Sequence, residues 1–203
     1  FLDIDASYEN RSATLSTVEA VASQVFIPLT VGGGVSKLQD IERLLEKGAD
    51  KVSINTSAIL DPSLVGNAAK KFGSQCIVVA VDSKREGEKS YVYTHGGKNK
   101  TAFETSAWIK IIESEGAGEI LLTSMDRDGT KIGFDNELTS SIAKDLSIPL
   151  ITSGGAGSID HMIEGITDGK ADAVLAASIF HQKEITIAEV KDGLASKGIE
   201  VRL

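Results

Sequence analysis

The sequence contains IPLTVGGG at residues 27–34 and IPLITSGG at residues 148–155, two matching stretches about 120 residues apart. Each stretch is a short apolar run that ends in glycines, and each is followed by a second match, GADKV at 48–52 and ADAV at 171–174. A short apolar run bounded by glycines predicts a buried strand followed by a tight loop. The spacing predicts an internal repeat, with copies over approximately residues 1–100 and 101–203.

Similar β-branched runs recur along the chain and alternate with segments of helical period. We expect strands at residues 1–4, 27–31, 51–54, 76–81, 120–123, 149–152 and 173–176. We expect helices at residues 37–47, 62–71, 103–115, 136–146 and 159–167. Gly48, Gly73, Gly116 and Gly169 follow helical segments and are expected to end them in a left-handed conformation. This alternation predicts a parallel α/β fold.

The number of repeating units indicates which parallel fold this is. Seven strand–helix units are present, and the chain starts directly inside a strand-like run. Residues 83–100 interrupt the repeat with a charged, alternating segment that predicts a β-hairpin over the strand ends. We predict a single domain over residues 1–203 that is a (β/α)₈ or TIM barrel with an internal half-barrel repeat. Its first strand–helix unit is expected to be missing from this chain.

The composition excludes several classes of function. Lys and Arg number 21 against 29 Asp and Glu, which gives a formal net charge of −8, and no basic run exceeds two residues. Nucleic acid is therefore not an expected partner. The single cysteine, Cys76, excludes an internal disulfide. No apolar stretch approaches the ~20 residues that cross a bilayer, so we expect a soluble, cytoplasmic protein that does not bind a membrane.

Consecutive glycines after a strand let the backbone approach an anion closely, because no Cβ atom screens the N–H groups. A second element follows the next strand of each copy, at residues 53–56 and 176–178. Loops after neighbouring strands of a TIM barrel commonly form a phosphate site. One glycine triplet is also typical of an ordinary turn, but two related copies favour two phosphate cradles. We therefore expect an elongated substrate with a phosphate at each end.

Acidic and polar residues stand where the expected strands end. Asp82 follows an apolar run, and partial burial there would raise the pKa of its carboxyl group toward the range used in proton transfer. We expect Asp82 to be a general acid or base, with an ordinary charged loop residue as the alternative. Asp3, Thr123 and Ser153 are candidate pocket residues, although each also suits an ordinary role at a strand end.

The remaining motifs argue against other chemistries. His161 and His181 have no nucleophile or metal-ligand partner at an informative spacing, and His95 stands in the expected hairpin, from which it could reach the mouth of the barrel. The sequence also lacks the motifs of serine hydrolases, zinc proteases, dithiol oxidoreductases and P-loop nucleotide triphosphatases. We expect no metal and no cofactor.

Five runs together resemble the cyclase subunit of imidazole glycerol phosphate synthase, the HisF family of histidine biosynthesis. They lie at residues 1–4 (FLDI), 30–34 (TVGGG), 49–56 (ADKVSINT), 118–130 (GEILLTSMDRDGT) and 153–157 (SGGAG). The resemblance covers essentially the whole chain. It implies a barrel that binds PRFAR, a linear bisphosphorylated ribulosyl aminoimidazole carboxamide. It also implies a lyase reaction in which PRFAR and ammonia give imidazole glycerol phosphate and the aminoimidazole carboxamide ribotide AICAR.

The resemblance assigns roles residue by residue. Asp82 matches one of the two catalytic aspartates of the family. One phosphate site is matched by Gly34, Asn55 and Thr56, and the other by Asp128, Gly129, Gly155, Ala177 and Ser178. The implied partner is a HisH-type glutaminase that forms a heterodimer and delivers ammonia through the barrel interior. Positions for its docking and for the ammonia gate are matched by Asp50, Lys51 and Glu119, which are alternatively solvated charges near the starts of strands.

Two departures leave alternatives open. The second catalytic aspartate of the family lies in a first strand that has no counterpart in residues 1–203, so we expect turnover only from a protein that includes this strand. Asp5 stands where the family more often has a small polar residue. The alternatives are the related isomerase of the preceding step, which shares both phosphate sites, and a catalytically inactive fragment that binds the glutaminase. Residues 53–56 and 123–130 favour the cyclase.

Overall fold

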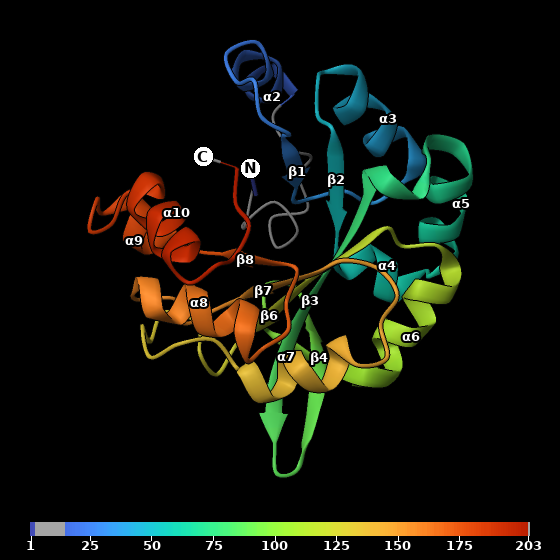
Figure 1. Ribbon diagram of the computed structural model, residues 1–203. Coiled ribbons are helices and arrows are strands. Elements are labelled where there is room, and N and C mark those ends of the chain that lie inside the picture. The colour runs from blue at the N-terminus through green and yellow to red at the C-terminus, as the bar shows by residue number, and fades with distance from the viewer. Residues whose placement is uncertain (3–14, 203) are drawn as a thin grey trace.

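Parallel strands form the centre of the molecule. The computed structural model describes residues 1, 2 and 15–202 (Figure 1). Neighbouring strands of the parallel path follow the order β1 (Thr30–Gly32), β2 (Lys51–Ile54), β3 (Ile77–Glu86), β6 (Glu119–Ser124), β7 (Leu150–Ser153) and β8 (Ala173–Leu175). Leu2 adds a parallel bridge to Gly32 beyond β1. The sheet curls into a half-barrel, which confirms the predicted α/β class and its TIM-barrel-like form.

Helices cover the outside of the curled sheet (Figure 1). The longer helices are α2 (Leu15–Ala22), α3 (Leu38–Glu46), α5 (Ser63–Phe72), α6 (Thr105–Glu115), α7 (Asn136–Ala143), α8 (Ile159–Thr167) and α10 (Ile187–Ser196). Short turns form α4 (Thr56–Leu60), the 3₁₀ helix η1 (Ser74–Cys76) and α9 (Ser178–His181). None of the helices in the described part of the chain is long and apolar enough to cross a membrane.

The two faces of the sheet carry different side chains because strand residues alternate in direction. Val79 and Val81 of β3 and Ile120 and Leu122 of β6 are fully buried, and they belong to one cluster with Trp108 of α6. The intervening residues of β3 and β6 point to the opposite, concave face. On that face Asp82 and Thr123 lie in register beyond the apolar pair Ala80 and Leu121.

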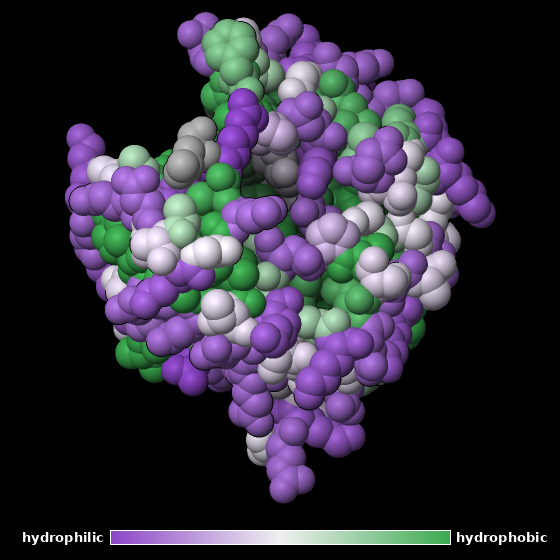
Figure 2. Space-filling view, viewed as in Figure 1, coloured by the Kyte–Doolittle hydropathy of each residue, from purple (hydrophilic) through white to green (hydrophobic). Residues whose placement is uncertain are grey.

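The predicted hairpin is present, and a third strand enlarges it to a three-stranded extension of the sheet. Strand β3 continues past its parallel partners and pairs antiparallel with β4 (Lys89–Thr94), which pairs in turn with β5 (Asn99–Glu104). The expected helix at 103–115 therefore begins only at Thr105. Figure 2 shows that the projecting tip of this extension is hydrophilic, whereas its base packs on α6 through Val92 of β4 and the ring contact between Phe103 and Trp108.

Glycines end several helices as predicted, with one correction. Gly48, Gly73 and Gly116 have positive φ values of 99°, 93° and 109°. Gly169 does not, and Lys170 takes the positive φ of 58° instead. A Cβ atom on Gly169 would lie 2.6 Å from the carbonyl oxygen of Gly165, so glycine is needed there for a close approach rather than for a left-handed turn.

The two halves of the sheet share a specific local structure. Asp50 Oδ2 accepts a hydrogen bond of 2.7 Å from the Leu29 N–H, and Asp172 Oδ2 accepts one of 2.9 Å from the Leu150 N–H. The two backbone N–H groups of these aspartates bond back to the same leucines, at 2.8 and 2.9 Å. Equivalent residues of the matching sequences thus make equivalent bonds, and each aspartate fixes the start of one strand against its neighbour.

Candidate functional site

A row of polar side chains crosses the concave face where the parallel strands end. Asp82 of β3 stands in register with Thr123 of β6, and Thr123 stands in register with Ser153 of β7. Residues in register on parallel strands point to the same side of the sheet. Asp82 lies within β3 rather than at its end, because β3 continues into the antiparallel extension at this residue. The three side chains therefore share one surface.

The first pocket includes two members of this row, Asp82 and Thr123, in its lining and has a cavity volume of about 180 Å³. Its walls come from the glycine loop after β1, the start of α4, the inner residues of β3 and β6, and the turn after β4. Among its lining residues are Gly33, Gly34, Asn55, Thr56, Asp82, Gly96 and Thr123. The structure thus brings Gly34, Asn55 and Thr56 together with Asp82 although they are far apart in sequence.

The second pocket lies at the matching position in the other half and has a volume of about 150 Å³. Its walls come from the β6–α7 loop, the glycine loop after β7, and the segment between β8 and α9. Among its lining residues are Asp128, Gly129, Lys131, Ser153, Gly154, Gly155, Ala177 and Ser178. All five residues expected at a second phosphate site therefore line one cavity. Asp3, the remaining pocket candidate, lies outside the described residues.

The two glycine loops have similar backbone conformations. Gly33 and Gly34 have φ values of 102° and 67°, and Gly154 and Gly155 have values of 91° and 101°. Residues that carry a side chain rarely adopt such φ values, so both loops require glycine at two successive positions. Loops of this kind present backbone N–H groups at close range, which is the geometry of an anion cradle.

The environment of Asp82 alters the acidity of its carboxyl group. Burial raises the pKa of Asp82 above its usual value, and the negative charge of Asp128 raises it further. A hydrogen bond of 2.9 Å from Asn55 Nδ2 to Asp82 Oδ2 lowers the pKa and so opposes part of this shift. A raised carboxyl pKa suits a group that must give and take protons near neutral pH. Asn55 Oδ1 is buried and has no hydrogen-bond partner among the described residues, so it remains available to accept a bond from a substrate hydroxyl or N–H.

A comparison with protein families decides the broad identity. The family model described as "Histidine biosynthesis protein" matches residues 1–186, which is most of the chain. The chain belongs to this histidine biosynthesis protein family. The family includes both the cyclase and the isomerase of the pathway, so membership makes the protein a histidine biosynthesis enzyme without choosing between the two.

The pKa of Asp82 provides a first test of this site. Removing the Asn55 amide by Asn55→Ala should raise the pKa of Asp82, because the donated hydrogen bond favours the ionised carboxylate. The change Asp128→Asn should lower it, because a repelling negative charge is removed. Carbon-detected NMR titration of the Asp82 carboxyl group measures both shifts. A downward shift in Asn55→Ala would show that the 2.9 Å bond does not control this carboxylate.

The opposite end of the concave face carries an ion pair. Lys51, at the start of β2, contacts Glu119, at the start of β6, with 2.7 Å between Nζ and Oε2. The Glu119 side chain is only 15% exposed. The strand register places this pair on the same face as Asp82 but at the other end of the strands. Asp50 does not join them, since its carboxylate is bonded to the Leu29 N–H. Lys51 and Glu119, two of the three residues expected at the gate and docking face, therefore form an ion pair. The third, Asp50, instead fixes the start of a strand.

The three-stranded extension touches the loops of both pockets. The His95 N–H donates a hydrogen bond of 3.0 Å to Thr56 Oγ1, beside the first pocket. The Met125 N–H donates one of 2.8 Å to the Ser83 carbonyl, and the Arg85 N–H donates one of 2.7 Å to Asp126 Oδ2, in the loop that leads to the second pocket. The extension therefore holds the two loops relative to one another. Because Thr56 accepts from His95, its hydroxyl proton is free to point to a bound anion.

Sequence reasoning missed the part that His161 plays. Its Nδ1 accepts a hydrogen bond of 3.1 Å from the Gly157 N–H, so the imidazole supports the second glycine loop from helix α8. His161 lies only four residues after Gly157. This short spacing was the one feature of the sequence that could have predicted the hydrogen bond between them. Among the described residues, no group of three or more His, Cys, Asp or Glu side chains is arranged to hold a metal ion.

Proposed function

We propose that the protein is the cyclase of imidazole glycerol phosphate synthesis, which converts PRFAR and ammonia to imidazole glycerol phosphate and AICAR. The observation that carries the proposal is the row on the concave face that links the two glycine-loop pockets: Asp82 and Thr123 line the first, and Ser153, next in register, lines the second. A substrate with a phosphate in each pocket would lie across these side chains. Its reacting centre would then be held beside the raised-pKa carboxyl group of Asp82.

Asp82 has a defined task in this proposal. Addition of ammonia to a substrate carbonyl and the later cleavage and ring closure all require protons to leave nitrogen and reach oxygen or a departing nitrogen. A carboxyl group that is partly buried suits both transfers, because burial raises its pKa and makes the protonated form easier to reach than in an exposed carboxylate. The phosphates supply binding energy away from the reacting atoms and thereby fix the reacting centre in place.

The proposed ammonia source is a HisH-type glutaminase that forms a heterodimer with this chain. The Lys51–Glu119 pair supports a route from the opposite end of the sheet, because it lies inside the curl rather than on the helix-covered surface. A paired cation and anion can part to admit a small neutral molecule and then pair again. The resemblance implies that the glutaminase docks at this same end.

The isomerase of the preceding step is the second candidate, because family membership and two phosphate pockets suit it equally. The assay that separates them uses purified protein that includes the expected first strand. We expect PRFAR absorbance to fall when an ammonium salt is added, with imidazole glycerol phosphate and AICAR as products. Formation of PRFAR from its aldose isomer, without any ammonia-dependent reaction, would establish the isomerase instead.

A further inference from the structure

Lys131 distinguishes the two pockets electrostatically. Within the described residues, it is the one Lys or Arg residue that lines either of them. Asp128 also lines the second pocket, and its negative charge would repel a phosphate dianion. A phosphate in this pocket therefore requires a compensating positive charge beyond the backbone N–H groups, and Lys131 is the group placed to supply it.

The backbone of Lys131 is fixed although its side chain ends near the surface. The residue has a φ of 58°, unusual for a lysine, and a Cβ atom on Gly157 would lie 2.6 Å from its carbonyl oxygen. The β6–α7 loop is thus packed closely on the glycine loop after β7. This packing determines where the side chain of Lys131 starts and limits where its ammonium group can reach.

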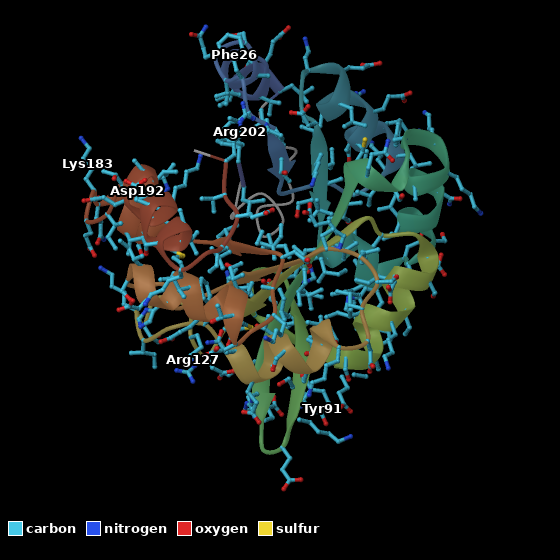
Figure 3. All side chains as sticks on the ribbon, viewed as in Figure 1. Phe26, Tyr91, Arg127, Lys183, Asp192 and Arg202 are labelled. Atoms are coloured by element: carbon cyan, nitrogen blue, oxygen red, sulfur yellow. The ribbon has the colours of Figure 1, made fainter. Side chains whose placement is uncertain are left out.

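The ammonium group of Lys131 is bound by residues that follow α9. Its Nζ lies 2.5 Å from Glu184 Oε1 and 3.3 Å from Gln182 Oε1. The side chains of Lys131 and Glu184 are 39% and 40% exposed. Figure 3 shows their neighbour Lys183 at the outer edge of the molecule, beside α9 and α10. Ser178, at the start of α9, lines the same pocket, so the ion pair joins two of its walls.

We propose that Lys131 is a binding residue for the second phosphate and that it exchanges Glu184 for the phosphate when substrate binds. This inference rests on the proposed function, which places a phosphate in the second pocket. Exposed ion pairs contribute little to stability, so Lys131 can leave Glu184 at small cost. A phosphate dianion offers three strong acceptor oxygens and makes stronger charge-assisted hydrogen bonds than an exposed carboxylate. Glu184 therefore competes with the phosphate and lowers its affinity.

A titration with inorganic phosphate tests this exchange and does not depend on enzymatic activity. The backbone amide NMR signals of Gly129 and Ser178 report phosphate binding to the second pocket. We expect Lys131→Met to weaken phosphate binding at these signals by about tenfold, a typical loss for one charged hydrogen bond. Glu184→Gln should strengthen it by about two- to threefold, because a competing carboxylate is removed. In the double variant the effect of Glu184→Gln should vanish. The Gly34 signal, in the first pocket, should titrate equally in all variants.

Lys110→Met is the matched control, since Lys110 forms a similar exposed ion pair with Asp145 away from both pockets. Unchanged phosphate affinity in Lys131→Met would overturn the inference and leave the proposed function intact. Weakening in Glu184→Gln as large as that in Lys131→Met would also overturn it, because the pair would then act only as a brace between the pocket walls. If the unaltered protein bound no phosphate at Ser178, both the inference and its premise would fail.

Discussion

Replacing Asp82 with asparagine should reduce the turnover of PRFAR by about 10²–10⁴-fold, the usual contribution of a general acid or base. Asparagine retains the shape of the side chain and can still accept the hydrogen bond from Asn55, but it cannot transfer a proton. Substrate binding should change little, because the phosphate pockets remain. The measurement is kcat and KM for PRFAR with an ammonium salt, on protein that includes the expected first strand.

The same variant should be more stable than the unaltered protein at neutral pH. The pKa of Asp82 is raised by burial, so the folded chain binds a proton at pH values where the unfolded chain has released it. The contribution of Asp82 to stability is therefore greatest at low pH and is lost as the pH rises through the folded-state pKa. An asparagine side chain does not ionise, so the Asp82→Asn variant avoids this loss. Its melting temperature should rise at pH 7 but not at pH 3, relative to the unaltered protein at the same pH.

Asp192→Asn is the control for Asp82, since Asp192 is exposed on α10 (Figure 3) and belongs to neither pocket. It should leave kcat and the melting temperature unchanged. Undiminished turnover in Asp82→Asn would exclude Asp82 as the proton-transfer group. A large fall in its melting temperature would show instead that the carboxylate is structurally required.

Gly155→Ala should have the largest effect on the second pocket. Gly155 has a φ of 101°, and its added Cβ atom would lie 2.2 Å from the Gly133 carbonyl oxygen. The Gly133 N–H also bonds to the Gly155 carbonyl at 2.8 Å, so neither backbone can withdraw without breaking this contact. We expect a loss of about 2–4 kcal/mol in the free energy of unfolding, from overpacking and backbone strain together. Phosphate binding at Ser178 should fall below detection.

Gly129→Ala is the matched comparison within the same pocket. Gly129 has a φ of 73°, but no atom lies within 4 Å of the position that its Cβ would occupy. Only the conformational cost remains, about 1 kcal/mol. Denaturant unfolding of both variants measures the difference. Equal destabilisation of the two would show that the close approach of Gly155 to Gly133 is not maintained in solution.

The features that sequence predicted are those encoded within short segments. The apolar runs that end in Gly32–Gly34 and Gly154–Gly155 predicted the strands, and the successive glycines predicted the tight loops that follow them. Helix α8 was predicted at its observed bounds, because its helical period is a local signal.

The features that sequence did not predict depend on contacts between distant segments. Strand β3 continues through Asp82, which pairs with both Thr123 of β6 and Tyr93 of β4. No local feature of the sequence indicates where the pairing with β4 begins. The bond from His95 to Thr56 and the pair between Lys131 and Glu184 join residues 39 and 53 positions apart. Such contacts follow from the packing of loops on the finished sheet, so they are visible only in the fold.

The most direct test of the two-pocket account is the stoichiometry of anion binding to the chain. Phosphorus NMR and calorimetry should show two inorganic phosphates per chain, one reported by the Gly34 amide and one by the Ser178 amide. PRFAR should bind one per chain and displace both phosphates together. Binding of a single phosphate, or of PRFAR that leaves one phosphate in place, would contradict the claim that the two pockets hold the two ends of one substrate.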